Sequence, residues 1–257
     1  MDTLSIKEIQ VRFKAGLLSA SEISALQNDD RAGVRKLLLA IERQTKVQEA
    51  LHHKAEAMLC FEKALWQQGI DLIAGVDEVG RGPLAGPVVA AAVILKPQQS
   101  ILYLDDSKKL SAEKRQRLTL EIKESVCSFA YGSASPEEID ELNIFQASLL
   151  AMRRAVNGLE QVPQQILIDG GHVLGDMPSK QSAIVGGDGK SQSIAAASVL
   201  AKTARDKMML DYAQEFPEYG FEKHVGYPTA AHIAALEKYG PSPIHRQSFG
   251  PVKRLRD

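Results

Sequence analysis

The chain has 257 residues, of which 44% are hydrophobic and 25% are charged, and its formal net charge is −1. These values indicate an ordinary globular chain of one large domain or two. Because the charge is close to zero, any surface for nucleic acid must be a local patch. No apolar run approaches the roughly 20 residues of a membrane span, and no signal peptide opens the chain. We therefore expect a cytoplasmic protein without a membrane partner.

The two cysteines, Cys60 and Cys127, suit a reducing compartment. Each is interpreted as a small packed side chain rather than a nucleophile or ligand. The Cys and His residues show no spacing typical of a zinc site.

Residues 1–70 are predicted to form a wholly helical N-terminal extension. Ser5 and Ser19 are each followed three residues later by a glutamate, which is typical of capping boxes. A longer helix with apolar residues at helical spacing follows and ends at Gly69. The charge of this region is balanced, which favours an appendage that packs on the main domain or a partner over a substrate-binding arm. Deleting residues 1–68 is therefore expected to leave a folded and active domain.

Residues 71–257 are expected to form the second domain, and its first strand, 72–76, ends on two adjacent carboxylates. Asp77 and Glu78 occupy positions at which a buried strand normally carries apolar residues. Buried carboxylates of this kind need a metal ion or an opposite charge to stabilise them. Because neighbouring strand residues face opposite ways, both acids can serve one site only at a strand end or twist. A salt-bridged strand end is the simpler alternative.

The turn after these acids contains Gly80-Arg81-Gly82-Pro83 and leads to a second predicted strand, 88–95. Glycines let the backbone approach a ligand closely. An arginine between them can meet a phosphate or the edge of a sugar. This turn favours a ligand-binding site over a salt-bridged strand end.

The remaining elements alternate between helix and strand, which predicts an α/β fold. Asn143, a polar residue within an apolar helix, is interpreted as hydrogen-bonded, with contact to the acid-bearing strand as the alternative. The predicted segments are helices at 112–123, 136–159, 194–213 and 229–239, strands at 126–133, 165–168 and 183–185, and a helical segment near the C-terminus.

Two more acids follow predicted strands. Asp169 ends the strand at 165–168 and precedes two glycines, which is a common active-site position in α/β folds. Asp188 precedes the helix at 194–213, where an acid also stabilises the helix dipole. Ser191 or Ser193 is expected to cap that helix. His172 lies in the loop after Asp169 and could act as a base or ligand, although a loop histidine usually does neither.

Several other polar side chains have two interpretations each. Ser107, Lys108, Lys202 and Arg205 are ordinary surface groups or contacts to a nucleic-acid backbone. Tyr227 lies in a Gly-Tyr-Pro turn, where an aromatic ring is a packing anchor or a platform for a base or sugar.

Four strings in this chain together resemble the ribonuclease HII family, the type 2 ribonucleases H. They cover residues from about Ile70 to the C-terminus and leave the helical extension outside. The strings are Asp77-Glu78-Val79-Gly80-Arg81-Gly82-Pro83-Leu84-Ala85-Gly86-Pro87, Asp106-Ser107-Lys108-Lys109-Leu110, the segment Gly187 to Lys202 of the form Gly-Asp-x-x-Ser-x-Ser-Ile-Ala-Ala-Ala-Ser-x-Leu-Ala-Lys, and Lys223-His224-Val225-Gly226-Tyr227-Pro228-Thr229.

This resemblance implies a ribonuclease H-like mixed sheet flanked by helices. It implies an endoribonuclease that hydrolyses RNA in RNA–DNA hybrids and incises DNA 5′ to single embedded ribonucleotides, as in ribonucleotide excision repair, leaving 3′-hydroxyl and 5′-phosphate ends. The catalytic residues would be Asp77, Glu78, Asp169 and Asp188, with metal held by the first three. The substrate-binding residues would be Gly80, Arg81, Gly82, Tyr227, Lys202, Arg205, Ser107 and Lys108.

The acids also indicate the cofactor. Carboxylate oxygens suit two Mg²⁺ or Mn²⁺ ions, and two such ions can hold the attacking and leaving oxygens of a phosphodiester. The partners would be RNA–DNA hybrids and DNA duplexes with embedded ribonucleotides. We expect a monomer, with a replication protein such as a sliding clamp or polymerase as a candidate partner. Two rival interpretations stay open: a binding module without catalysis, and a metal nuclease or integrase of the same fold that acts on DNA alone.

Overall fold

The computed structural model describes residues 5–255, so residues 1–4 and 256–257 of the two predicted domains lie outside the described residues. The chain forms two compact units, Met1–Lys54 and Ala55–Asp257. This division lies earlier than the predicted boundary between residues 70 and 71. No helix within 5–255 is both long enough and apolar enough to cross a membrane.

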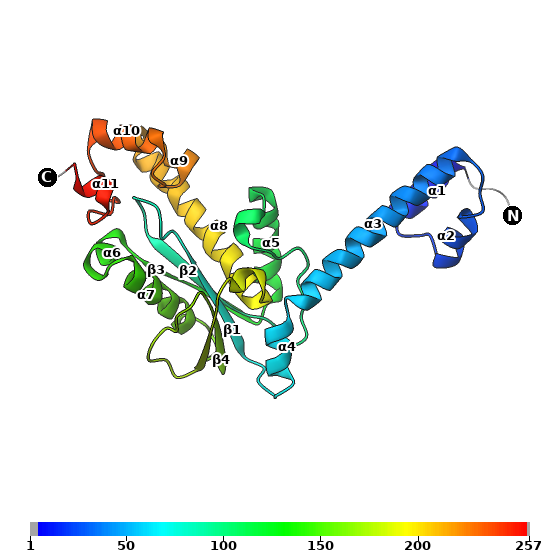
Figure 1. Cartoon of the computed structure of the whole chain (residues 1–257), viewed down its shortest axis with the longest axis horizontal. Helices are drawn as coiled ribbons and strands as arrows, with labels where there is room; N and C mark the ends of the chain where they lie inside the picture. The colour runs from blue at the N-terminus through cyan, green and yellow to red at the C-terminus, as the bar shows by residue number, and fades with distance from the viewer. Residues whose placement is uncertain (1–4, 256–257) are drawn as a thin grey trace. The chain divides into compact units, whose positions relative to one another are not determined.

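The second unit is built on a five-stranded mixed sheet with the strand order β3-β2-β1-β4-β5 (Figure 1). β1 pairs antiparallel with β2, which pairs antiparallel with β3, whereas β1–β4 and β4–β5 are parallel. The predicted fold, a mixed sheet flanked by helices, is therefore confirmed. The strands are β1 (Ile73–Val79), β2 (Val88–Ile94), β3 (Ser128–Ala134), β4 (Gln165–Asp169) and β5 (Lys180–Ile184).

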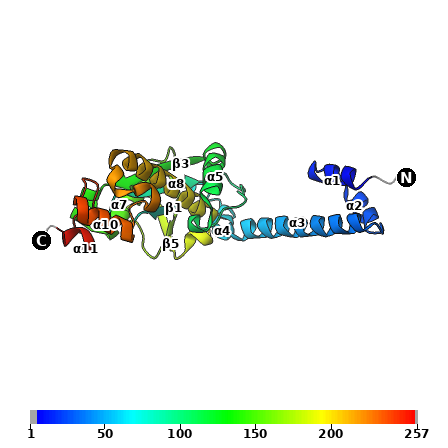
Figure 2. The same ribbon diagram turned by 90° about the horizontal axis from the view of Figure 1, so that it is seen from above.

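Helices cover both faces of this sheet, and the alternation of strand side chains assigns each residue to one face. In β2, Ala91 and Val93 belong to the cluster that includes α8 (Gln192–Glu215) and α5 (Ala112–Ser125). Their neighbours Ala90 and Ala92 belong to the opposite cluster, with α7 (Ile144–Asn157). The turned view in Figure 2 shows α8 and α7 around the same sheet.

Small residues let the two covering helices approach the sheet closely. A Cβ atom at Gly75 of β1 would lie 2.1 Å from the carbonyl carbon of Ser193 in α8. One at Gly132 of β3 would lie 2.1 Å from the carbonyl oxygen of Ala151 in α7. The contact at Gly75 fixes the first turn of α8 against β1, the strand that bears the acidic pair.

Asn143 interrupts the single helix that the sequence predicts at 136–159. It adopts a φ of 72°, and its side chain accepts hydrogen bonds from the backbone N–H groups of Phe145 and Gln146. The segment therefore forms two helices, α6 (Pro136–Leu142) and α7. The predicted serine cap of α8 is found, since the Ser191 side chain accepts from the Ile194 N–H. The C-terminal elements are η3 (Pro217–Tyr219), α9 (Phe221–His224), α10 (Ala230–Tyr239) and α11 (Gly250–Lys253), and the short turns η1 (Ser107–Lys109) and η2 (Gly187–Gly189) lie earlier in the chain.

The N-terminal unit is helical, as predicted. It contains α1 (Ile6–Lys14), α2 (Ala20–Leu26) and most of α3 (Ala32–Ala57) around a small apolar cluster that includes Ile9 and Val34. Both predicted capping boxes are present, at Ser5 and Ser19.

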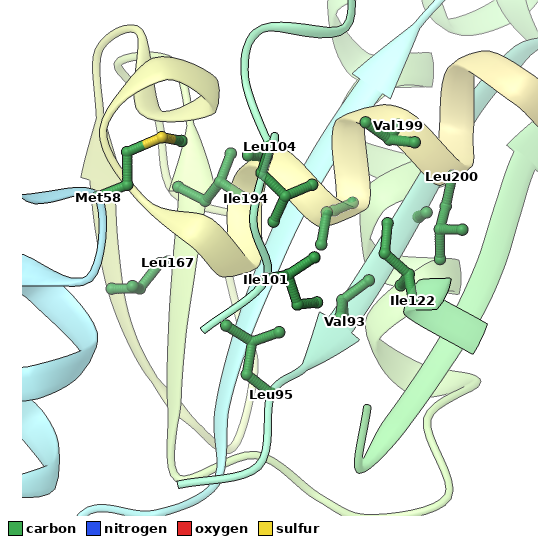
Figure 3. Close-up of a cluster of buried hydrophobic side chains, with 14 of the residues drawn as sticks. Met58, Val93, Leu95, Ile101, Leu104, Ile122, Leu167, Ile194, Val199 and Leu200 are labelled. Atoms are coloured by element: carbon green, nitrogen blue, oxygen red, sulfur yellow. The ribbon is translucent and has the colours of Figure 1, made fainter. Parts of the chain in front are cut away.

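The predicted long helix ends earlier than Gly69, because the chain breaks between α3 and α4 (Cys60–Trp66). Residues of the break and of α4 are part of the main core of the second unit: Met58 and Leu59 of the break and Trp66 of α4 are buried in the cluster with α8. Figure 3 shows Met58 in this cluster with Ile194 and Leu167.

Glu62 of α4 gives the same region a buried polar contact. One of its carboxylate oxygens accepts from the Ser191 hydroxyl at 2.6 Å, the Ser193 hydroxyl at 2.7 Å and the Ser193 N–H at 3.0 Å. Glu62 therefore satisfies donors at the start of α8, where a helix has free N–H groups.

These contacts change the expectation for truncated proteins. Removing residues 1–54 should leave the melting temperature of the second unit nearly unchanged. Removing residues 1–68 deletes several buried side chains, each worth about 2–5 kcal/mol, and should lower the melting temperature by on the order of 10 °C or prevent folding. Thermal unfolding of both truncated proteins checks this, and equal melting temperatures would refute the assignment of α4 to the second core.

Candidate active site

Four carboxylates converge at one edge of the sheet. Asp77 and Glu78 lie near the end of β1, Asp169 ends the adjacent parallel strand β4, and Asp188 lies in η2 just before α8. Strand alternation sends Asp77 toward α8, whereas Glu78 lines a cavity with residues of α7 and with Asp169. The sheet thus brings together the four acids that the sequence separates.

Asp169 stands at the centre of this group. Its negative charge raises the pKa of Asp77, of Glu78 and of Asp188, in each case after the larger effect of burial. Its Oδ1 also accepts a hydrogen bond from the Gly187 N–H at 2.7 Å, which ties the loop of Asp188 to the end of β4. A Cβ atom at position 187 would lie 2.6 Å from Ile194 Cδ1 and 3.3 Å from Asp169 Oδ1, so this turn packs closely against both side chains.

The pKa values of the acidic pair show how unfavourable this arrangement is without a cation. Asp77 is buried, and desolvation followed by the charges of Glu78 and Asp169 raises its pKa well above the usual range. Burial likewise raises the pKa of Glu78 to about 7, although the Arg81 guanidinium, 3.4 Å away, acts in the opposite direction. Such repulsion among carboxylates is relieved when a metal ion lies between them.

The donor atoms fit a hard divalent cation such as Mg²⁺ or Mn²⁺. The structure nevertheless holds individual acids in other contacts: Asp77 Oδ1 accepts from the Glu78 N–H at 2.7 Å, and Glu78 pairs with Arg81. Within residues 5–255, no three Asp, Glu, His or Cys side chains form a complete metal-ligand cluster. Binding of a cation would therefore require small side-chain rotations, which leaves the metal-ligand roles of Asp77, Glu78 and Asp169 as predictions.

The loop from Gly80 to Pro87 follows the acids, and two buried arginines hold it. Arg205 of α8 donates to the carbonyl oxygens of Pro87 at 3.0 Å, Ala85 at 3.1 Å and Val225 at 3.0 Å. The expectation that Arg205 contacts phosphate is wrong, because its side chain is fully buried and its donors are used within the protein.

Arg246 is the second of these arginines. It donates to the carbonyl oxygens of Gly80 at 2.6 Å, Arg81 at 3.0 Å and Gly86 at 2.8 Å. Burial lowers the pKa of Arg205 to about 10 and that of Arg246 to about 9, so both remain charged at neutral pH. Their positive charges lie directly under the loop and favour an anionic ligand on its outer side.

Sequence reasoning missed this use of the arginines. Arg205 lies on α8 near the buried small residue Ala201, a pattern that indicates a buried helix face. Nothing in the local sequence marks Arg246 as buried.

The structure also shows which of the other predicted substrate-binding residues are exposed and which are buried. Ser107 is buried, and its Oγ accepts from the Ser198 hydroxyl at 3.0 Å, so a direct contact between the Ser107 side chain and substrate is contradicted. Lys108 is exposed, and its charge lowers the pKa of Asp188 against the larger effect of burial. Lys202 pairs with Asp206 at 2.7 Å, which leaves its contact with phosphate a prediction.

Tyr227 lies beside the glycine-rich loop. Its side chain is 40% exposed, and a Cβ atom added to Gly82 would lie 3.4 Å from the Tyr227 ring. The backbone of the two segments is joined by a hydrogen bond from the Leu84 N–H to the Gly226 carbonyl at 2.8 Å. His172 is exposed and packs edge-on against Phe145 near the acids. Arg81, Gly82 and Tyr227 therefore form one exposed surface beside the carboxylates.

Comparison with known proteins agrees with this arrangement. The profile of the family described as Ribonuclease HII matches residues 74–252, and a profile described as Ribonuclease HII N-terminal domain matches residues 5–66. Ribonuclease HII of Bacillus licheniformis is 48% identical over 258 residues, covering 98% of this chain and 99% of that protein. Ribonuclease HII of a Marinomonas species is 55% identical over 185 residues, covering 72% of this chain and 93% of that protein. The ribonuclease H2 structure from Pyrococcus horikoshii has a TM-score of 0.61 at 24% identity, covers 71% of this chain and 96% of that one, and supports the fold.

These matches define a hydrolase of the ribonuclease H class. The chain belongs to the ribonuclease HII family. It is accordingly a metal-dependent endonuclease that acts on the RNA of RNA–DNA hybrids. One expectation needs correction: the helical extension does not lie outside the resemblance, because the family's N-terminal profile matches it.

The raised pKa of Glu78 leads to a stability prediction for the metal-free protein. Between pH 4.5 and about 7 the unfolded chain loses this proton before the folded chain does, so this group lowers the free energy of unfolding as pH rises. In EDTA, Glu78→Gln should match the wild type near pH 4.5 and exceed it above pH 7 by up to about 3 kcal/mol. Urea unfolding at pH 4.5 and pH 8 measures this, and titrating groups that do not interact with Glu78 cancel in the difference from wild type. A variant no more stable than wild type at pH 8 would contradict it.

Proposed function

We propose that this enzyme incises duplex DNA 5′ to a single embedded ribonucleotide, as well as cleaving longer RNA tracts, by catalysis with two divalent cations. The observation that carries this proposal is the convergence of Asp77, Glu78, Asp169 and Asp188 beside the exposed surface of Arg81, Gly82 and Tyr227. The four carboxylates can hold cations, and the surface of Arg81, Gly82 and Tyr227 can distinguish ribose from deoxyribose at the cleaved bond.

In this mechanism Asp77, Glu78 and Asp169 would hold the cations, and Asp188 would complete the site. When bound, Mg²⁺ or Mn²⁺ supplies Lewis acidity at the phosphodiester and lowers the pKa of a water. A structure of Bst ribonuclease HIII was determined in complex with Mn²⁺, which supports a divalent cation in this fold. Asp169 keeps the Asp188 loop in place through its hydrogen bond to Gly187.

The glycine-rich loop would place the substrate. Five carbonyl oxygens of this loop point inward to Arg205 and Arg246. This arrangement leaves the outer side of the loop, near Arg81, for the nucleic acid. The exposed ammonium of Lys108 adds positive charge near Asp188. Phosphate contacts of this kind position a duplex without reading its sequence.

Discrimination between ribose and deoxyribose must come from the 2′-hydroxyl. The backbone at Gly80, Arg81 and Gly82 would accept or donate to this hydroxyl, and the Tyr227 ring beside Gly82 would stack under the adjacent deoxyribose. A bulkier residue at position 82 would crowd this ring.

We further propose cytoplasmic action, which suits the two unpaired cysteines, Cys60 and Cys127. A replication protein remains a candidate partner, since a ribonuclease HII structure from Archaeoglobus fulgidus was solved as a complex with PCNA.

Asp169→Asn is the direct test of the metal site. The variant keeps an oxygen that can accept from the Gly187 N–H, so the fold should persist while a metal ligand is lost. We expect a rate loss of at least about a hundredfold, or about 3 kcal/mol, with substrate binding largely kept. Single-turnover cleavage in Mg²⁺ measures it, with Asp176→Asn as a matched control, because Asp176 is an exposed acid on a nearby loop.

The substrates and cations in this assay separate the rival interpretations. Duplexes with zero, one and four ribonucleotides are incubated with Mg²⁺, Mn²⁺ or EDTA. Cleavage of the all-DNA duplex would indicate a DNA nuclease, and binding without metal-dependent cleavage would indicate a binding module. Near-normal turnover by Asp169→Asn would refute the metal site.

Tyr227→Ala tests the reading of the sugar. Loss of a stacking ring costs about 1–3 kcal/mol, and this loss should fall more heavily on a single ribonucleotide than on a four-ribonucleotide tract. Tyr227→Phe should stay active on both substrates because the ring remains. Rates on the two substrates are compared at one fixed salt concentration, since phosphate contacts depend on salt. Equal losses on both substrates would make the ring a general groove contact, and no loss on either would make it a packing anchor.

A further inference from the structure

Three buried histidines lie beneath the turn that carries Tyr227, and the mechanism above does not use them. His224 ends α9, His232 lies in α10 and His245 lies in the segment after α10. Their exposed fractions are 8%, 0% and 1%. Buried histidines are normally hydrogen-bonded, so their partners show what they hold in place.

The partners determine which nitrogen of each ring carries the proton. The Ser242 N–H donates to His245 Nδ1 at 2.9 Å, so that nitrogen is unprotonated. The His232 Nδ1 lies 2.9 Å from the Tyr227 carbonyl oxygen, which can only accept, so that nitrogen carries a proton. The two rings meet through their Nε2 atoms at 3.0 Å. In neutral rings the bridging proton must therefore belong to His245 Nε2.

The result is a chain of hydrogen bonds that runs in one direction, from Ser242 through His245 and His232 to the backbone of Tyr227. The other backbone group of Tyr227 is held as well, since its N–H donates to the His224 carbonyl at 2.9 Å. Each ring nitrogen in the His232–His245 pair has a partner. The Tyr227 carbonyl also accepts from the Thr229 N–H at 2.8 Å, so removing the His232 ring nitrogens would take away one of its two hydrogen bonds and loosen this side of the turn.

The same chain reaches the glycine-rich loop. His245 forms an antiparallel bridge with Ala85, and the neighbouring Ile244 carbonyl accepts from the Gly86 N–H at 2.8 Å. Arg246, the next residue, donates to Gly80 and Arg81. The His245–His232 hydrogen bond therefore joins the segment that fixes the loop to the helix that fixes Tyr227.

We propose that His232 and His245 are positioning residues that set the place of the Tyr227 ring relative to the Gly80–Gly82 backbone, and thereby the preference for a single embedded ribonucleotide. This inference rests on the proposed function, because it takes Tyr227 as the residue that reads the sugar. Neither histidine touches the substrate.

Protonation would break this arrangement. A second proton on His232 would place N–H groups on both sides of the Nε2–Nε2 contact. Burial, followed by the charge of the partner ring, lowers the pKa of His245 to about 4, and burial is also the main cause that lowers the pKa of His232. Other titratable or charged groups around the pair are His224, stacked on His232 with ring centroids 4.5 Å apart, Tyr219, 5.0 Å from His245, and Arg246.

The experiment measures the ratio of the cleavage rate at one ribonucleotide to the rate within four, because this ratio cancels general losses of activity. His232→Phe keeps a ring but no hydrogen-bonding nitrogen, whereas His232→Asn keeps a donor near the Nδ1 position. We expect His232→Phe to lower the ratio about threefold to tenfold and His232→Asn to restore part of it. Wild type should lose the ratio only below pH 5, as pH approaches the pKa of about 4 of His245, and His232→Phe should not. His53→Phe is the matched control, since His53 is exposed in α3.

A double variant ties the effect to Tyr227. In the Tyr227→Ala background, His232→Phe should change the ratio no further, because residues that act through one another are not additive. If Tyr227→Ala lowers the ratio and a folded His232→Phe does not, the positioning role is wrong while the proposed function stands. If Tyr227→Ala leaves the ratio unchanged, the reading of the sugar by Tyr227 and the positioning role are both overturned, whereas incision at a single ribonucleotide is tested by the duplex assay itself.

A measurement on the wild-type protein needs no variant to fold. Long-range ¹H–¹⁵N NMR of the imidazole rings reports which nitrogen carries the proton. At pH 7 we expect His232 to be protonated at Nδ1 and His245 at Nε2, both neutral. The opposite arrangement, or a charged ring in the pair, would overturn the inference.

Discussion

Repulsion among four carboxylates at the carboxyl ends of β1 and β4 is the main constraint on this structure. Asp169 acts on the pKa of the other three, and burial adds to the cost of ionising Asp77 and Glu78. This cluster destabilises the folded state, because buried like charges disfavour folding. The surrounding structure must therefore supply the energy that holds the acids in place. The alternating apolar faces of the sheet, with α7 and α8 packed on them, supply it.

The nucleic-acid side of the site depends on a different device. The buried side chains of Arg205, Arg246 and His232 donate hydrogen bonds to backbone carbonyls of the protein rather than to a ligand. A loop that contains Gly80, Gly82 and Gly86 has little rigidity of its own, because glycine restricts the backbone least. Hydrogen bonds from Arg205 and Arg246 give the loop a defined shape and place two positive charges beneath it. The residues that look most suited to bind phosphate thus act from inside the protein.

The N-terminal region has two physical parts. Residues up to Lys54 form a compact unit with its own small apolar cluster. The following segment belongs to the core of the catalytic unit, where Glu62 meets the donors at the start of α8. Since the same helix start follows the Asp188 loop, α4 supports the edge at which the acids converge. A family profile that runs from residue 5 to residue 66 covers both parts.

The sequence by itself determined the class of fold, the helical extension with its two capping boxes, and the identity of the acids, because periodicity, capping residues and strand-end carboxylates are local signals. Tertiary structure alone decided which polar side chains are exposed beside the acids and which are buried. Nothing in the local sequence marks Ser107 or Arg246 as buried, and for Arg205 the only signal is its small neighbour Ala201 on α8, yet all three are buried. It also decided that the helix breaks before α4, because the chain there shifts into another core and depends on distant partners. The break at Asn143, by contrast, rests on a local cap of the Phe145 and Gln146 N–H groups. The burial and hydrogen-bond partners of Ser107 and Arg246 arise from contacts between remote segments, which local patterns such as capping boxes do not encode.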